Sequence, residues 1–167
     1  YGLEVRFELL KSIPDSVRAW RAGEVDVLWI TVDDLPTEYP QLQPLRPVLF
    51  MLTGWSRGEE QLVVRPDIQT LNDLKGKRVA LEPKTPAHSF LLISLDLAGL
   101  DYDDVTIVSA RSSRDAADRF IRGDADAAMV WVDEKEDCLG EVPGAFVLES
   151  TKDASFLIAE SLVVKAE

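Results

Sequence analysis

Apolar and polar positions in the first part of the chain predict short strands separated by one clear helix. Residues 3–10 begin with alternating apolar and polar side chains, which is typical of a strand. A helix follows over residues 14–22: Ser12 is placed to cap its start, Asp15 completes an acidic variant of the capping box, and Gly23 ends it. Apolar runs predict three further strands, at residues 25–30, 48–52 and 62–64.

The same pattern restarts after a turn-rich segment at residues 71–77. Thr85 and Pro86 open a helix that runs to Ala98, and Ser112 and Ser113 cap a second helix over 114–122. Strands are predicted at residues 78–81, 105–108, 127–131 and 146–148, and a last apolar run at 157–164. Strands that alternate with helices indicate βαβ units, a parallel sheet and the α/β fold class.

An internal repeat links the two halves. Residues 5–34 align with residues 105–134 without a gap, at a constant offset of 100 from residue 5 to residue 105. The matched positions include a capping serine, a helix aromatic and a glycine-acidic-x-aspartate turn: Ser12 and Ser112, Trp20 and Phe120, Gly23-Glu24-Val25-Asp26 and Gly123-Asp124-Ala125-Asp126. The repeat predicts two related α/β lobes, and ligands favour domain interfaces and the carboxyl ends of parallel strands.

Composition removes several classes of function. Lys and Arg number 18 against 30 Asp and Glu, a formal charge of −12, whereas nucleic-acid binders carry basic patches. The single cysteine, Cys138, permits neither an intrachain disulfide nor a cysteine zinc cluster. No apolar run approaches the ~18 residues of a membrane span. The abrupt opening at Tyr1 predicts a chain trimmed from a longer one.

Signs of catalysis are missing from the sequence. It contains no GxSxG nucleophile elbow, no HExxH, no P-loop and no GxGxxG after a strand. The adjacent carboxylates Asp33 and Asp34 would point to opposite faces of a strand, which suits acid–base chemistry poorly. We therefore expect no catalytic residues, no cofactor and no metal.

An ordered series of short motifs resembles a known family. The series is Ser56-x-Gly58, Leu62-Val63-Val64, Leu71-x-Asp73-Leu74-Lys75-Gly76-Lys77-x-Val79, His88-Ser89-Phe90-Leu91-Leu92, Ala98-Gly99-Leu100, Asp103-Asp104-Val105 and Gly123-Asp124-Ala125-Asp126-Ala127-Ala128 with Trp131. It resembles the substrate-binding proteins of ABC importers, in the nitrate, sulfonate, taurine and thiamine-precursor branch.

This resemblance implies a type II periplasmic binding fold, in which two Rossmann-like lobes joined by two hinge strands close on a small solute and deliver it to an ABC permease. Residues 1–61 would form an incomplete first lobe, 62–69 the first crossing, 70–150 the second lobe and 151–167 the return crossing. Hinge rotation is expected at 62–67 and 155–158. Compared with the family, the chain lacks the opening strand and helix of the first lobe and the closing helices. A monomer in the periplasm or another extracytoplasmic space is implied, with any membrane anchor outside this segment and no nucleic-acid partner.

In the second lobe, the resemblance and the helix starts point to the same loops. Thr85, Ala87, His88 and Ser89 lie in the first turn of a helix, where free N–H groups attract anions. Thr85 is equally an ordinary cap, and His88 an ordinary hydrogen-bonding residue. Three more candidates follow later strands: Ser112 as cap or ligand contact, Trp131 as pocket wall or core residue, and Asp133 beside it.

In the first lobe, Thr31 and Asp33 follow a strand, and Trp55, Ser56 and Arg57 follow the next. Arg57 can pair a carboxylate or sulfonate in bidentate fashion or remain an exposed loop residue. The acidic Asp33 favours a cationic or neutral solute over an anion.

Two other functions remain open. The same fold serves as a sensory or regulatory module of larger proteins, and some relatives make the thiamine pyrimidine as enzymes that use a histidine and a cysteine-rich motif.

Overall fold

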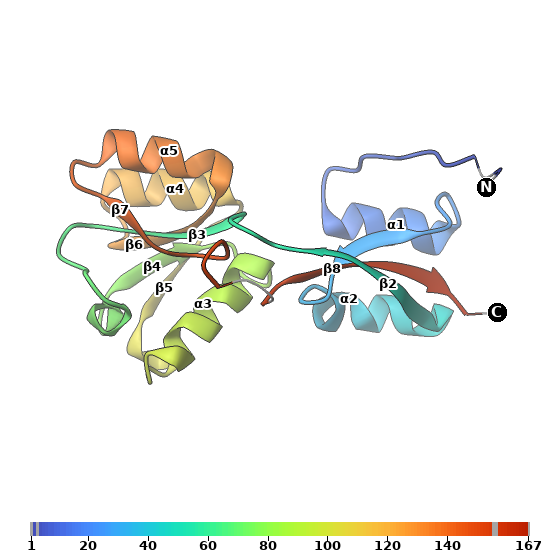
Figure 1. Ribbon diagram of the computed structural model, residues 1–167, viewed down its shortest axis with the longest axis horizontal. Coiled ribbons are helices and arrows are strands. Elements are labelled where there is room, and N and C mark those ends of the chain that lie inside the picture. The colour runs from blue at the N-terminus through green and yellow to red at the C-terminus, as the bar shows by residue number, and fades with distance from the viewer. Residues whose placement is uncertain (1, 3, 155–156, 167) are drawn as a thin grey trace. The chain divides into compact units, whose positions relative to one another are not determined.

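The computed structural model describes residues 2, 4–154 and 157–166, and it divides the chain into two compact units (Figure 1). Unit 1 comprises Tyr1–Gly54 and Ala159–Glu167, and unit 2 comprises Trp55–Ile158. The division differs from the predicted one, because the chain leaves unit 1 between Gly54 and Trp55 rather than at residue 62. Leu62 to Val64, predicted as a crossing, are instead fully buried in a central strand of unit 2. Of the predicted second hinge, Ser155 and Phe156 lie outside the described residues.

Unit 1 contains a three-stranded sheet in the order β1-β8-β2. Its elements are α1 (Ile13–Ala22), β1 (Leu28–Thr31), α2 (Leu35–Leu42), a 3-10 turn (Gln43–Leu45), β2 (Pro47–Trp55) and β8 (Ala159–Lys165). β1 and β8 are antiparallel, with Leu28 opposite Val163. Trp20 of α1 and Leu42 of α2 are fully buried against these strands, so one small core holds the unit together.

The strand predicted over residues 3–10 is wrong. Residues 4–10 carry no regular secondary structure, and Phe7 and Leu9 are 93% and 100% exposed. The alternation is present, but a strand needs a neighbour that completes its hydrogen bonds.

Unit 2 contains a five-stranded sheet in the order β5-β4-β6-β3-β7. Its elements are β3 (Glu60–Val64), 3-10 turns at Leu71–Leu74 and Tyr102–Asp104, β4 (Arg78–Leu81), α3 (Pro86–Leu97), β5 (Thr106–Ser109), α4 (Ser113–Arg122), β6 (Ala127–Trp131), α5 (Val132–Glu141) and β7 (Phe146–Ser150). β4 pairs in parallel with β5 and β6, whereas β3 runs antiparallel to β6 and β7. The predicted parallel sheet is thus confirmed for three strands and becomes mixed at β3.

Helices cover both faces of this sheet, with α3 on one face and α4 and α5 on the other (Figure 1). Alternate residues of β3 explain the arrangement: Leu62 packs in the core that holds Phe90 of α3, and Val63 packs in the core that holds Phe120 of α4. Both faces of β3 are covered, and all five of its residues are buried, including the polar Glu60 and Gln61.

The internal repeat is confirmed in atomic detail. α1 and α4 begin and end at positions 100 residues apart, and the hydroxyls of Ser12 and Ser112 accept hydrogen bonds from the Asp15 and Asp115 amides at 3.2 and 3.1 Å. Both helices end at a left-handed glycine, Gly23 with φ 78° and Gly123 with φ 84°. Trp20 and Phe120 are both fully buried.

Candidate functional site

The topology of unit 2 brings many loops to one edge of its sheet, which we call the carboxyl edge. β4, β5 and β6 are parallel, so their carboxyl ends meet there. Because β3 is antiparallel, its first residue, Glu60, lies opposite Trp131 at the end of β6. β7 also ends there, with Ser150 opposite Gln61. Ligands of open α/β sheets bind at this kind of edge.

Ten of the twelve residues predicted to bind ligand lie on segments at the carboxyl edge. They are Trp55, Ser56, Arg57, Thr85, Ala87, His88, Ser89, Ser112, Trp131 and Asp133. The other two, Thr31 and Asp33, belong to unit 1. There, the Thr31 hydroxyl donates to the Asp34 carboxylate at 2.7 Å, so this acidic turn after β1 is internally hydrogen-bonded.

The start of α3 is shaped by backbone rather than by a side-chain cap. The Thr85 hydroxyl donates backward to the Glu82 carbonyl at 2.8 Å, so the predicted side-chain capping by Thr85 is wrong. Lys84 takes a left-handed conformation with φ 64°, which turns the chain sharply into the helix. Ala87 is buried in the core below α3, so only its backbone is at hand for a ligand. Pro86 has no N–H, and the His88 and Ser89 amides donate to the Thr85 carbonyl at 2.9 and 3.1 Å, which leaves the Ala87 amide as the donor of the first turn of α3 at this edge.

His88 is held neutral by its surroundings. Its Nδ1 accepts a hydrogen bond from the Lys84 amide at 3.1 Å, which places the ring proton on Nε2. Nε2 is buried without a hydrogen-bond partner among the described residues, and the Tyr102 ring lies 5.6 Å away. Desolvation by burial lowers the pKa of His88. The residue therefore stabilises the turn before α3 and carries no positive charge for an anion.

Ser112 and its neighbour Ser113 have different roles. Ser112 caps α4, which confirms the cap interpretation. Ser113 is buried, accepts a hydrogen bond from the Trp131 amide at 2.8 Å and donates to Glu134 at 2.6 Å. It thereby joins the starts of α4 and α5 at the carboxyl edge.

Trp131 ends β6 with 47% of its surface exposed, although the four preceding residues of the strand are buried. Trp131 belongs to neither core cluster of unit 2, and the role of its indole as a pocket wall stays a prediction. Asp133, two residues later, is exposed in the first turn of α5.

A buried polar cluster beside these loops escaped the sequence analysis. Glu60 accepts hydrogen bonds from the hydroxyls of Ser56 and Thr151, the latter at 3.1 Å, and Thr151 also accepts from the Gly58 amide at 2.8 Å. Burial raises the pKa of Glu60, while the two hydroxyls oppose that rise. Thr151 lies far from Ser56 in sequence and has no motif around it, so only the pairing of β3 with β7 reveals the cluster.

Three helices of eight or more residues, α3, α4 and α5, start at the carboxyl edge. Each helix start carries the positive end of a macrodipole, which favours a negatively charged group. Some of the first amides are already paired, those of His88 and Ser89 with the Thr85 carbonyl and that of Val132 with the Glu59 carbonyl. Exposed Asp133 and buried Glu60 act against an anion placed close to them. The arrangement can hold an anionic head group by backbone donors, with Trp131 beside it.

Nothing described at the edge suggests a metal or a nucleophile. Among the described residues, no group of three or more His, Cys, Asp or Glu side chains is arranged to hold a metal ion. Cys138 is fully buried on α5, and desolvation raises its pKa to about 11. It packs in the core under α4 and α5, on the opposite face of the sheet from α3 and His88. Within the ranges the structure describes, no helix is long and apolar enough to cross a membrane.

Comparison with known proteins identifies relatives over most of the chain. Residues 1–142 match the family described as ABC transporter, phosphonate, periplasmic substrate-binding protein. The taurine-binding periplasmic protein of Escherichia coli is 31% identical over 130 residues, which is 78% of this chain and 40% of that protein. These relatives are binding proteins.

Solved structures share the fold. The periplasmic aliphatic sulphonate binding protein from Escherichia coli has a TM-score of 0.76 at 23% identity, covering 92% of this chain and 52% of that one. The alkanesulfonate-binding protein from Xanthomonas axonopodis pv. citri, bound to MOPS, has a TM-score of 0.65 at 23% identity, covering 91% of this chain and 52% of that one. The chain thus spans about half the length of these proteins. With its α/β units and the family match over residues 1–142, it belongs to the periplasmic substrate-binding proteins of ABC transporters, in the phosphonate type.

Proposed function

We propose that this chain is the ligand-binding part of a periplasmic solute receptor for an ABC permease, and that its solute carries a sulfonate or phosphonate group. The observation that carries the proposal is the meeting of three helix starts at the carboxyl edge of unit 2. Backbone N–H donors bind an oxyanion without a buried cation, which suits a protein with a net charge of −12. The names of the relatives, taurine- and sulphonate-binding, support the same chemical class.

Within this proposal, the anionic group lies against the first turns of α3 and α4, and Trp131 covers the apolar part of the solute. Arg57, on the loop before β3, supplies a bidentate cation to the same head group. Thr31 and Asp33 of unit 1 remain predicted contacts. The Asp33 carboxylate favours a solute that also bears an ammonium group.

Two alternatives to the transport receptor are a sensory module and an enzyme. A sensory module would share the same binding edge, and only its partner would differ. An enzyme that works through a histidine and a cysteine is disfavoured, because Cys138 is buried with a raised pKa on the opposite face of the sheet from His88.

The test is a thermal-shift and calorimetric screen of the full-length protein in Tris buffer. The solutes are taurine, MOPS, methylphosphonate, nitrate, acetate and, as a cation, putrescine. A ligand that binds only the folded state raises the melting temperature. At a concentration 100 times its Kd, it adds about 2.7 kcal/mol to the free energy of unfolding. Binding of a sulfonate or phosphonate but not of putrescine is the expected result. A rise in melting temperature with putrescine alone would refute the proposal that the solute is an oxyanion. It would instead support the acidic residues as the groups that select the charge of the solute.

A further inference from the structure

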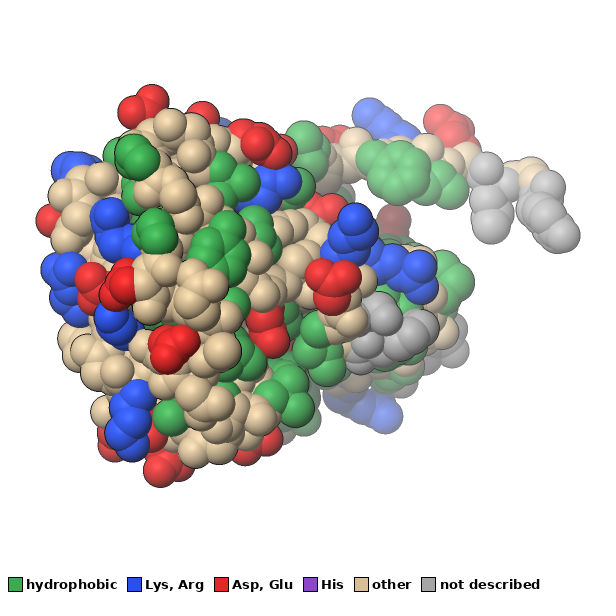
Figure 2. Space-filling model, turned by 60° about the vertical axis from the view of Figure 1, so that its left-hand side comes forward, with side chains coloured by type: hydrophobic (Ala, Val, Ile, Leu, Met, Phe, Trp, Pro, Cys, Tyr) green, Lys and Arg blue, Asp and Glu red, His purple; other side chains and the backbone are tan. Residues whose placement is uncertain are grey.

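A short loop of unit 2 carries Arg57, the cation that the proposed function places on the head group of the solute. The loop comprises residues 56–59 and joins β2 to β3. Figure 2 shows basic and acidic side chains interspersed over one face of unit 2 rather than gathered by sign. In a chain with a net charge of −12, an arginine that selects an anion has to be held where the anion binds. The backbone of this loop is therefore of interest.

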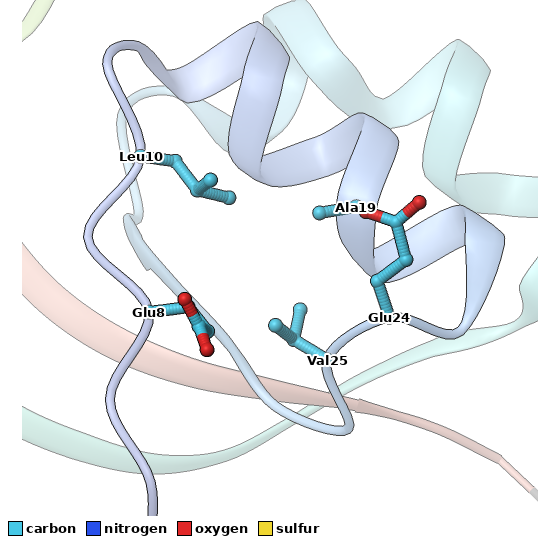
Figure 3. Close-up of a pocket in the computed structure, with 5 residues that line it drawn as sticks. All are labelled: Glu8, Leu10, Ala19, Glu24 and Val25. Atoms are coloured by element: carbon cyan, nitrogen blue, oxygen red, sulfur yellow. The ribbon is translucent and has the colours of Figure 1, made fainter.

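A hollow in unit 1 suits an anion less well. Its volume is about 190 Å³, and Figure 3 shows the side chains that line it. Two of them are carboxylates and three are apolar: Glu8, Glu24, Leu10, Ala19 and Val25. Because carboxylates repel an oxyanion, we expect an anionic solute at the carboxyl edge of unit 2 and not in this hollow.

Both neighbours of Arg57 contact the same buried hydroxyl. The Gly58 amide donates to Thr151 Oγ1 at 2.8 Å, and the Ser56 hydroxyl lies 3.0 Å from the same oxygen. Thr151 follows β7 directly and is fully buried. Gly58 has φ 107°, a conformation that L side chains rarely adopt, so the shape of the loop depends on this glycine. The loop is thus fastened at positions 56 and 58, with Arg57 between them.

Glu60 determines which way the Thr151 hydroxyl points. Thr151 Oγ1 donates to the Glu60 carboxylate at 3.1 Å, and the Thr151 amide donates to the Glu60 carbonyl at 3.2 Å. A hydroxyl has a single hydrogen, so donation to Glu60 leaves the lone pairs of Thr151 Oγ1 to accept the Gly58 amide. Glu60 and Thr151 therefore act in sequence on the backbone beside Arg57.

The same loop is tied to the residue after Trp131, because the Val132 amide donates to the Glu59 carbonyl at 2.9 Å. We propose that Thr151 is a positioning residue for anion binding, which fixes the backbone that carries Arg57 beside Trp131 before the solute arrives. A binding group that is already in place loses less conformational entropy when the ligand binds. This inference rests on the proposed function and adds to it a buried residue that acts through Arg57.

A double-mutant cycle in the full-length protein, measured by calorimetry with taurine, MOPS and methylphosphonate, tests the inference. Thr151→Val keeps the shape of the side chain but removes its hydroxyl, so we expect it to weaken binding of the anion that responds about 10-fold. In the Arg57→Ala protein, the same substitution should weaken binding by less than about 2-fold, because the residue it acts through is gone. Equal losses with and without Arg57 would overturn the inference while leaving the proposed function intact. A wild type that binds none of the three anions would overturn both.

Two further variants separate positioning from stability. Thr151→Ser keeps the hydroxyl and should bind the anion within about 2-fold of the wild type. Ser94→Ala is the matched control, since Ser94 is buried in α3 and its hydroxyl also donates to a carboxylate, that of Glu149, at 2.8 Å. It should lower the melting temperature and leave the affinity unchanged. Equal losses of affinity in Ser94→Ala and Thr151→Val would overturn the inference, because the loss would then follow from stability alone.

Hydrogen exchange provides a measurement that needs no solute. The Gly58 amide should exchange at least ~10-fold faster in Thr151→Val than in the wild type, because its acceptor has been removed. Thr151→Ser should restore the slow exchange. Equal exchange of the Gly58 amide in Thr151→Val and the wild type would show that Thr151 does not fix the loop and would overturn the inference.

Discussion

At the scale of single residues, the sequence predicted the start of the helix at Thr85 correctly but the hydrogen bond of the Thr85 hydroxyl wrongly. The Thr-Pro pair marks the first residue of α3 correctly, because proline at the first helical position is favoured by its fixed φ. The hydroxyl nevertheless bonds backward to Glu82, since the left-handed Lys84 reverses the chain just before it. Sequence indicates where a helix begins more readily than it indicates which way a rotamer points.

His88 provides a prediction about pH. Since burial lowers its pKa, the folded protein binds its proton less readily than the unfolded chain, whose histidine titrates near 6.5. This contribution to stability is complete above pH 6.5 and is lost as the pH falls through the folded-state pKa. His88→Asn keeps an acceptor for the Lys84 amide but does not titrate, so its melting temperature should fall less than that of the wild type on acidification from pH 8 to 5. Equal decreases in melting temperature for the two proteins between pH 8 and 5 would contradict a lowered pKa of His88.

Trp131 provides a prediction about binding. If the exposed indole covers the solute, Trp131→Ala should weaken the affinity for the responding sulfonate or phosphonate roughly 10-fold, or about 1.4 kcal/mol. Asp103→Ala, at an exposed position of the turn before β5, is the control and should leave the affinity unchanged. Calorimetry of both variants measures the two affinities. Equal affinities would contradict a solute-binding site at Trp131 and the carboxyl edge.

At the scale of elements, the sequence predicted the internal repeat because the residues that define it interact over only a few positions. Capping serines, helix-ending glycines and buried aromatics act within one helix, so α1 and α4 match their predicted bounds to within a residue. Two helices were missed. α2 carries Pro36 and Pro40, which suggest a loop, and α5 follows β6 directly without a side-chain cap.

The glycine that ends α4 tests the repeat energetically. Gly123 has φ 84°, which an L side chain adopts at a cost of about 1 kcal/mol or more, so Gly123→Ala should lower the free energy of unfolding by that amount. Gly140 in α5 is the matched control: it has no positive φ, and an added Cβ meets no atom within 4 Å. Gly140→Ala should therefore stabilise by up to about 1 kcal/mol. Chemical denaturation measures the free energy of unfolding of both variants. Changes of the same sign would contradict the need for a left-handed glycine at position 123.

At the scale of the whole molecule, the two units differ in completeness. Unit 2 is one continuous stretch of chain with two core clusters and helices on both faces of its sheet. Unit 1 is discontinuous, and the consecutive apolar residues Val48 to Leu52 of its edge strand β2 are each 40% to 52% exposed. Exposed apolar edge strands invite pairing with other chains.

This difference predicts which unit folds alone. A fragment of residues 55–158 should unfold in one cooperative transition, because its sheet and both cores are contained in it. The fragment 1–54 should remain unfolded, because β8 supplies the central strand of its sheet. Circular dichroism during thermal melting distinguishes the two, and a non-cooperative melt of the longer fragment would show that unit 2 depends on unit 1.

The sequence by itself determined the α/β class, the repeat, most strands, the capped helices and the family resemblance, all of which depend on neighbours a few residues apart or on ordered local motifs. Only the tertiary structure decided that β3 is a buried inner strand of unit 2, that residues 4–10 form no strand, and that Ser56, Glu60 and Thr151 meet. These outcomes depend on which segments pair across long stretches of chain. An apolar alternation describes what a strand can bury, and the presence of a neighbouring strand decides whether it forms.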